Sequence, residues 1–346
     1  AAPLLSLFLV GLAVAQEFPR PISDRFGRRP VLIWGLLVYV AASLGAVGAV
    51  SINELLVARV LPSLGATVGV PLARTIVRDL YPPPKAAAML GYVTMGMVVG
   101  PMLSPTVGGL LDTLLGWQAI FLACASMGSI TLVAVVAVMP ETRPRELVGT
   151  TTREVWDRSI ALLGRGRFVA FVLVLAPSSA MFWAFQGGSP YLVIELMGID
   201  KTIYGMWFAL GAFGYMSGNF VAGQLSERLG GTRMIAWGNG FAVLGAGVIV
   251  LLALVPVVHP LALFAPVFVM AIGNGMLLPN AISGAVSVDA KAAGAASGLL
   301  GFCQMGLSAG VSWLSGQNSV DSALPMGLLM LSLALVSILA SPFARR

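Results

Sequence analysis

Two acid–arginine pairs occupy matching places in the sequence. Asp24-Arg25 lies in "ISDRFGRRP", and Glu227-Arg228 lies in "LSERLGGTR" 203 positions later. An acid at the start of a helix binds the exposed N–H groups there, and it can also pair with an arginine across a gap between helices. The chemistry that these residues offer is reversible ion pairing, in which no covalent bond is made or broken.

Arg59 lies about one turn inside an apolar stretch of the chain. A charge within a membrane is costly and is usually functional, although an arginine near a helix end can also extend its head to the interface. If the protein exchanged protons across a membrane, it would need a carboxylate in the middle of such a stretch to gain and lose the proton. We find none there, so Glu17, near the cytoplasmic end of its stretch, is the fallback candidate.

Other reactive groups are few. Cys124 and Cys303 sit in apolar runs, where small buried hydrophobes are expected, and His259 is the only histidine. No Ser/His/Asp, Cys/His or metal-ligand cluster appears, and no Gly-rich loop ends in Gly-Lys-Ser/Thr. We therefore expect neither an enzyme nor an ATP-driven pump, and no metal site or organic cofactor.

The composition identifies the environment of these residues. The 346-residue chain is 58% hydrophobic and 10% charged, and its mean hydropathy is +0.93. A soluble domain carries about a quarter of charged residues. The apolar runs are about 20 residues long, enough for a helix to cross ~30 Å of hydrocarbon, whereas barrel strands are shorter and alternate. The sequence thus predicts an all-α integral membrane protein.

Eleven membrane spans are expected. Their predicted ranges are 3–18, 31–50, 55–77, 87–111, 117–139, 168–194, 203–225, 234–255, 261–284, 292–315 and 323–343.

The basic residues predict the orientation. All but three of the 20 Lys and Arg residues fall in one set of alternating loops or at the C-terminus, the exceptions being Arg59, Arg74 and Lys201. The positive-inside rule places these loops and the C-terminus in the cytoplasm. The net charge of +6 therefore reflects topology, and nucleic-acid binding is a poor explanation because the charges are spread over many short loops.

The repeated acid–arginine pair divides the chain. We predict an N-terminal half at 1–139, a central cytoplasmic loop at 140–167 and a C-terminal half at 168–346, a common design of secondary transporters. In the second half 59 residues separate Phe168 from Glu227, whereas only 23 precede Asp24 in the first. The shortfall equals about one span with its loop. We expect that the first helix of a twelve-helix protein is absent from this sequence.

Several motifs resemble the major facilitator superfamily. "SDRFGRRP" resembles its signature loop, and "GMVVGPMLSPTVGG" resembles the Gly-Pro motif that marks the drug–proton antiporters on the fifth helix. "PLARTIVRDLYP", "GWQAIF" and "PETRP" resemble the Bcr/CflA branch, and the resemblance covers essentially the whole chain. Two features depart from the pattern: Arg20 replaces the leading Gly of the signature loop, and Val-Leu-Pro-Ser follows Arg59.

The resemblance implies a fold of two pseudo-symmetric helical halves and assigns roles to three groups of residues. It implies a signature-loop latch that closes the halves on the cytoplasmic side, formed by Asp24, Arg25, Gly27, Arg28, Arg29, Glu227 and Arg228. It implies a helix that packs against its counterpart in the other half and limits proton leak, carrying Gly96, Gly100, Pro101, Pro105, Gly108 and Gly109. It also favours Arg59 as a cavity charge coupled to an acid of the first helix.

Polar and aromatic residues within the later spans are candidates for substrate contact. They are Trp183, Gln186, Tyr191, Trp207, Asn219, Asn274, Asn280 and Gln304. An amide in a span more often forms a helix–helix hydrogen bond than a ligand contact. As a set, aromatic walls with few amides suit a bulky, weakly charged molecule.

The expected function is export of drug-like small molecules across the bacterial inner membrane by alternating access, with protons as counter-ions and the proton gradient as the energy source. We expect a multi-pass monomer in the lipid bilayer that binds no nucleic acid. Two alternatives remain: a metabolite transporter of the same fold, and a truncated, transport-incompetent fragment, because the acid expected in the first helix would be missing.

Overall fold

The computed structural model describes residues 9–10, 19–81, 89, 100, 103–142, 152–255, 259–289, 292–318 and 322–344. Chain contacts divide it into two compact units. Among the described residues, the larger unit holds 158–344 together with 103–110, and the smaller unit holds the remainder.

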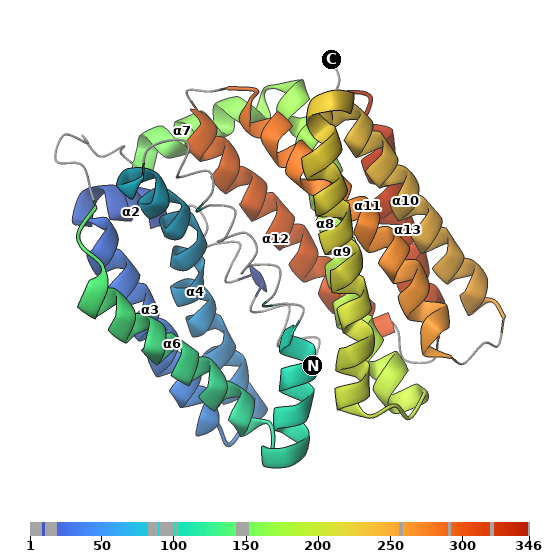
Figure 1. The fold of residues 1–346 in the computed structure, drawn as a ribbon, viewed down its shortest axis with the longest axis horizontal. Helices are drawn as coiled ribbons and strands as arrows, with labels where there is room; N and C mark the ends of the chain where they lie inside the picture. The colour runs from blue at the N-terminus through green and yellow to red at the C-terminus, as the bar shows by residue number, and fades with distance from the viewer. Residues whose placement is uncertain are drawn as a thin grey trace. The chain divides into compact units, whose positions relative to one another are not determined.

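The smaller unit is built on three long helices. They are α3 (Arg28–Val47), α4 (Ile52–Leu80) and α6 (Gln118–Val138), preceded by the short α2 (Pro19–Phe26). The helix α3 packs against both α4 and α6, and α2 contacts α3 and α4 (Figure 1).

Six long helices form the main bundle in the described part of the larger unit. They are α8 (Gly166–Pro190), continued by the π-helix η1 (Tyr191–Leu196), then α9 (Lys201–Leu229), α10 (Gly231–Ala253), α11 (Pro260–Val286), α12 (Ala293–Asn318) and α13 (Leu324–Ala340). The helix α8 packs against α11, α12 and α13, and α11 also packs against α9 and α10 (Figure 1). A core of Phe185, Phe208, Phe264 and their aliphatic neighbours joins them.

The predicted spans agree with the helices that the structure describes. By length and composition, α3, α6, α8 with η1, α10 and α11 could each cross a membrane. The helices α4, α9 and α12 are 29, 29 and 26 residues long, which also exceeds the ~20 residues that a crossing requires. The predicted spans 3–18 and 87–111 fall mostly outside the described residues.

Two features of the secondary structure differ from expectation. The predicted central loop, 140–167, contains the helix α7 (Thr152–Leu163). The signature segment is helical up to Phe26 rather than a loop, and its second copy forms the end of α9. Asp24 and Glu227 therefore stand near helix C-termini, not at helix starts. The reason is that a single glycine, Gly27 or Gly230, suffices to make each turn.

The two halves share a close helix contact at equivalent positions. Gly35 of α3 faces Gly65 of α4, and a methyl group added to Gly35 would lie 3.1 Å from the Gly65 carbonyl oxygen. Gly238, 203 positions after Gly35, faces Gly273 of α11, and its added methyl group would lie 2.5 Å from that carbonyl oxygen. Small residues let membrane helices approach in this way. The repeat that the sequence predicts thus extends to how the helices pack.

Candidate functional site: the signature turn and the interior of the helical halves

The signature turn depends on glycine. Gly27 has φ +100° and Gly230 has φ +84°, a left-handed region that L side chains rarely adopt. Each glycine is also the N-cap of the next helix, and neither provides a side chain to bind the exposed N–H groups there.

Glu141 supplies that acceptor for α3. Its Oε1 accepts the N–H of Arg28 at 2.8 Å, and its Oε2 accepts the N–H of Arg29 at 3.2 Å. A carboxylate at a helix N-terminus satisfies exposed N–H groups and stabilises the helix dipole. A methyl group on Gly27 would lie 2.5 Å from Oε2, so the turn leaves room for this carboxylate only because residue 27 is glycine. The acid cap expected from Asp24 is thus provided by Glu141.

The arginine side chains fasten the same turn to neighbouring helices of the smaller unit. Arg28 is 6% exposed, its Nε lies 3.3 Å from Oδ2 of Asp79 at the end of α4, and its Nη1 donates to Ser23 Oγ at 3.0 Å. Arg29 donates to the carbonyl of Val136 in the last turn of α6 at 2.8 Å. The signature turn is therefore held by the ends of α4 and α6.

The other predicted latch residues are placed only in part. Arg25 is exposed at the end of α2, with its guanidinium 5.4 Å from the Phe26 ring. Glu227 and Arg228 are exposed in the last turn of α9. The side chain of Asp24 lies outside the described residues. The latch between the halves therefore stays a prediction.

The larger unit has an ion pair of its own that sequence analysis did not identify. Arg165, the N-cap residue of α8, places Nη2 2.8 Å from Oδ2 of Asp289 and donates from Nη1 to the Val288 carbonyl at 3.2 Å. Asp289 follows α11, so this pair joins the start of α8 to the end of α11. Because Arg165 and Asp289 are 124 positions apart, no local sequence pattern indicates this ion pair.

The structure places the coupling candidates as follows. Arg59 lies within α4, although its side chain is outside the described residues, and Glu17 lies outside them altogether. Described acids on the long apolar helices lie at helix ends, as Glu54 does in the first turn of α4. Within the described ranges, no carboxylate lies in the middle of a long apolar helix.

The Gly-Pro segment contacts a helix of the second half. Residues 103–115 are helical, and a methyl group on Gly109 would lie 2.7 Å from the Lys201 carbonyl oxygen at the start of α9. On the other side of this contact, a methyl group on Gly205 would lie 2.5 Å from Cα of Thr106. The described close neighbour of this segment is thus the start of α9, and packing against the fifth helix of the second half stays a prediction. Gly100 and Gly108 have open space around them, and Gly96 and Pro101 are outside the described residues.

Three of the amide candidates already have hydrogen-bond partners. Asn219 and Asn280 each donate to the backbone carbonyl four residues earlier, at 2.8 Å and 2.9 Å. Gln304 of α12 donates to Ser179 Oγ of α8 at 2.7 Å, which is a helix–helix bond. In contrast, Gln186 Oε1 and Asn274 Oδ1 are buried without a hydrogen-bond partner among the described residues. These two oxygens therefore have unused capacity to accept a hydrogen bond.

The aromatic candidates join a chain of rings at one end of the larger unit. Trp207 stacks on Phe264 at 5.9 Å, and its indole meets the His259 ring edge-on at 6.5 Å. Trp183 meets Phe182 edge-on at 5.4 Å. Tyr191 is exposed at the first position of η1. Trp183 and Trp207 are therefore held by other aromatic rings.

Comparisons with known proteins agree with this architecture. The family profile of the Major Facilitator Superfamily matches residues 2–313. Multidrug resistance protein D of Escherichia coli (strain K12) is 31% identical over 99% of this chain and 86% of its own length. Multidrug resistance protein MdtL of Shewanella oneidensis is 29% identical, with 96% and 83% covered, and a bicyclomycin resistance protein homolog of Haemophilus influenzae is 23% identical, with 98% and 85% covered.

Solved structures agree on the fold. A peptide transporter POT in complex with alafosfalin superposes with a TM-score of 0.76 at 19% identity, covering 99% of this chain and 86% of that one. A D-xylose-proton symporter gives a TM-score of 0.74 at 16% identity, covering 96% and 85%. At these identities the likeness concerns the fold alone.

Proposed function

The chain belongs to the major facilitator superfamily, and from that membership we propose that it exports drug-like small molecules across the bacterial inner membrane in exchange for protons. The observation that carries the proposal is similarity along almost the whole chain to multidrug resistance proteins. The bicyclomycin resistance homolog supports the same class of substrate. The protein is not an enzyme, and the proton gradient is its source of energy.

The contact between the Gly-Pro segment and α9 supports the antiport part of the proposal. Gly109 and Gly205 bring the two backbones so close that a methyl group on either would overlap the partner backbone. Such packing excludes water, and a proton needs water or polar side chains to cross. A tightly sealed contact favours obligatory exchange over leak.

The signature turn supports alternating access. Glu141 and Asp79 tie it to α6 and α4 of its own half, so the turn moves with that half as one piece. Closure on the cytoplasmic side would then use the outward-facing charges, Arg25 in the first half and Glu227 and Arg228 in the second. The distribution of basic residues over the loops supports a cytoplasmic position for this side and for the C-terminus.

The residues of the second half support a bulky, weakly charged substrate. Gln186 and Asn274 offer buried acceptor oxygens, and Trp183 offers a partly buried ring. Mid-span acids, which would favour a cation, are absent from the described ranges. We expect one transporter molecule to form the whole path as a monomer.

Drug susceptibility tests this function. Cells that express the full chain should tolerate higher concentrations of bicyclomycin or chloramphenicol than cells that carry the empty vector. A protonophore should abolish the difference, because export would lose its driving force. Resistance that persists with the protonophore would contradict antiport. Unchanged susceptibility to a broad drug panel, with the protein present in the membrane, would contradict drug export.

A further inference from the structure

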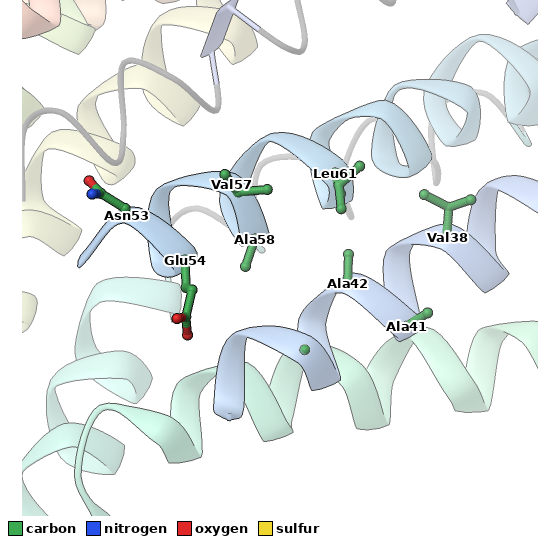
Figure 2. A pocket seen from close by; sticks show the side chains of 9 residues that line it. Val38, Ala41, Ala42, Asn53, Glu54, Val57, Ala58 and Leu61 are labelled. Carbon is green, nitrogen blue, oxygen red and sulfur yellow. The ribbon is translucent and has the colours of Figure 1, made fainter. Parts of the chain in front are cut away.

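A groove runs between α3 and α4 at the end of α3 remote from the signature turn. Its volume is about 660 Å³, within the ~300–1,000 Å³ usual for ligand pockets. It is lined by Val38, Ala41, Ala42, Gly45, Asn53, Glu54, Val57, Ala58 and Leu61. Figure 2 shows Ala58 and Leu61 on α4 pointing toward Ala42 on α3, with the Glu54 carboxylate at one end.

Small side chains on α3 create the groove. In the second half, residues 203 positions later place Leu244 where Ala41 stands and Val248 where Gly45 stands. Leu244 is 57% exposed, so the equivalent face of α10 is covered by a large apolar side chain. A methyl group on Gly45 would meet no heavy atom within 4 Å. The first half thus carries small side chains at positions where the second half carries larger ones.

The dimensions of the groove suit one acyl chain. From Asn53 to Leu61, α4 rises ~12 Å at 1.5 Å per residue, close to the ~15 Å of hydrocarbon in one leaflet. Apart from Asn53 and Glu54, every lining residue is apolar. Since the superfamily is membrane-embedded, an apolar groove on two of its long helices is suited to a lipid acyl chain.

The polar end of the groove carries a fixed negative charge. Glu54 and Ser51 together cap the start of α4: the Glu54 N–H donates to Ser51 Oγ at 3.2 Å, and Glu54 Oε2 accepts the N–H of Val50, the residue before the N-cap, at 3.0 Å. In the part of the chain that the structure describes, Glu54 has no ion-pair partner. Its Oε1 remains available to an external donor.

We propose that this groove binds one acyl chain of a membrane lipid whose head group carries a primary ammonium, with Glu54 as the anchor of that head group. An ammonium group complements the carboxylate, whereas an anionic head group would be repelled by it. The proposal rests on the membrane location and does not depend on drug export. Phosphatidylethanolamine has the required chemistry: an apolar chain for Ala42, Ala58 and Leu61, and an ammonium for Glu54.

Native mass spectrometry of the full chain can test this proposal with defined lipids. We would titrate the detergent-solubilised protein with phosphatidylethanolamine and, separately, with phosphatidylglycerol of the same acyl chains. The first should bind about two- to fivefold more tightly, as expected of an exposed ion pair. In Glu54→Gln the amide oxygen can still accept the Val50 N–H, so the cap persists while the charge is lost. The preference between the two lipids should then disappear.

Filling the groove gives a second, independent variant. Ala41→Leu/Gly45→Val installs the side chains of α10, and both lipids should lose their tightest site. Gly240→Leu is the matched control, because Gly240 is exposed on α10 with open space around it, and its binding should equal wild type. An unchanged head-group preference in Glu54→Gln, or unchanged binding in the filled variant, would overturn the proposal. So would a dimer that dissociates when the groove is filled, because the occupant would then be a second copy.

Discussion

A single carboxylate, that of Glu141, organises the signature turn. It accepts two successive backbone N–H groups at the start of α3, and it occupies the space that any side chain at residue 27 would need. Capping and turn geometry are therefore coupled, although the two residues are 114 positions apart.

Gly27→Ala and Gly230→Ala separate the two effects. Both positions have positive φ, so each alanine should cost about 1–3 kcal/mol of backbone strain. Only Gly27→Ala should also displace Glu141, because Gly230 has open space around it. We therefore expect a larger loss of thermal stability for Gly27→Ala, measured by unfolding in detergent. Equal losses of thermal stability in the two variants would show that displacement of Glu141 does not destabilise the protein.

Removal of the Glu141 carboxylate should weaken the start of α3. Glu141→Ala leaves the N–H groups of Arg28 and Arg29 without their acceptor, and loss of a helix cap costs about 1 kcal/mol. Thermal unfolding would measure the loss, and the double variant with Gly27→Ala should lose less than the two single variants combined. Strict additivity would contradict the coupling, since residues in contact are not additive.

The first turn of α9 is capped by a side chain and is also in close contact with the Gly-Pro segment. Asp200 is its N-cap, and Lys201 directly after it carries the carbonyl that faces Gly109. The Thr202 N–H donates to Asp200 Oδ1 at 2.7 Å, and this bond lowers the pKa of Asp200 below its usual 3.8. The cap thus also fixes the helix turn that receives the Gly-Pro segment.

Acid should loosen this start of α9. Since the folded-state pKa of Asp200 is lowered, the ionised cap contributes stability above the unfolded value of 3.8 and loses it as the pH falls through the folded value. Asp200→Asn keeps a good cap without ionising. Stability curves from pH 7 to pH 2 should therefore fall less steeply in Asp200→Asn than in wild type. If stability fell equally steeply with pH in both proteins, ionised Asp200 would not contribute to the stability of this helix start.

Neighbouring glycines on the Gly-Pro segment provide a matched comparison. Gly109→Ala should overlap the Lys201 carbonyl and force the segment away from α9, at a cost of about 1–3 kcal/mol. Gly108→Ala points into open space and should behave as wild type. In proteoliposomes, a pH-sensitive dye should report faster proton leak for Gly109→Ala alone. Equal rates of proton leak in the two variants would show that the contact between Gly109 and Lys201 does not limit the leak.

At the scale of the whole molecule, the repeat predicts parallel responses. Gly238→Ala should destabilise the protein more than Gly35→Ala, because its methyl group would lie 2.5 Å rather than 3.1 Å from the facing carbonyl oxygen. Gly240→Ala, which meets nothing within 4 Å, is the control. Thermal unfolding in detergent would rank the three variants. A reversed order would contradict the closer approach of α10 and α11 at Gly238.

The sequence predicted the spans and the repeat because hydropathy and a recurring motif can both be recognised along the chain without knowledge of its packing. It could not predict that Arg28 pairs with Asp79 or that Glu141 caps α3, since those partners meet only after the helices pack. It wrongly predicted a loop over Pro19–Phe26, because charged residues masked a helix that one glycine can end. Among the site residues, the resemblance of the Gly-Pro motif implied that Gly109 lies on a packing helix, but it did not indicate the contact with α9.

The one-residue turns also determine where this chain tolerates changes in length. Because α2 and α3 are separated by Gly27 alone, an inserted residue would rotate the start of α3 by about 100° relative to α2. Gly35 would then face away from α4, and the Arg28 and Arg29 N–H groups would leave Glu141. The same holds at Gly230 for α10. An epitope tag or a fluorescent reporter placed at either corner should abolish folding, so both glycines should be avoided as fusion points.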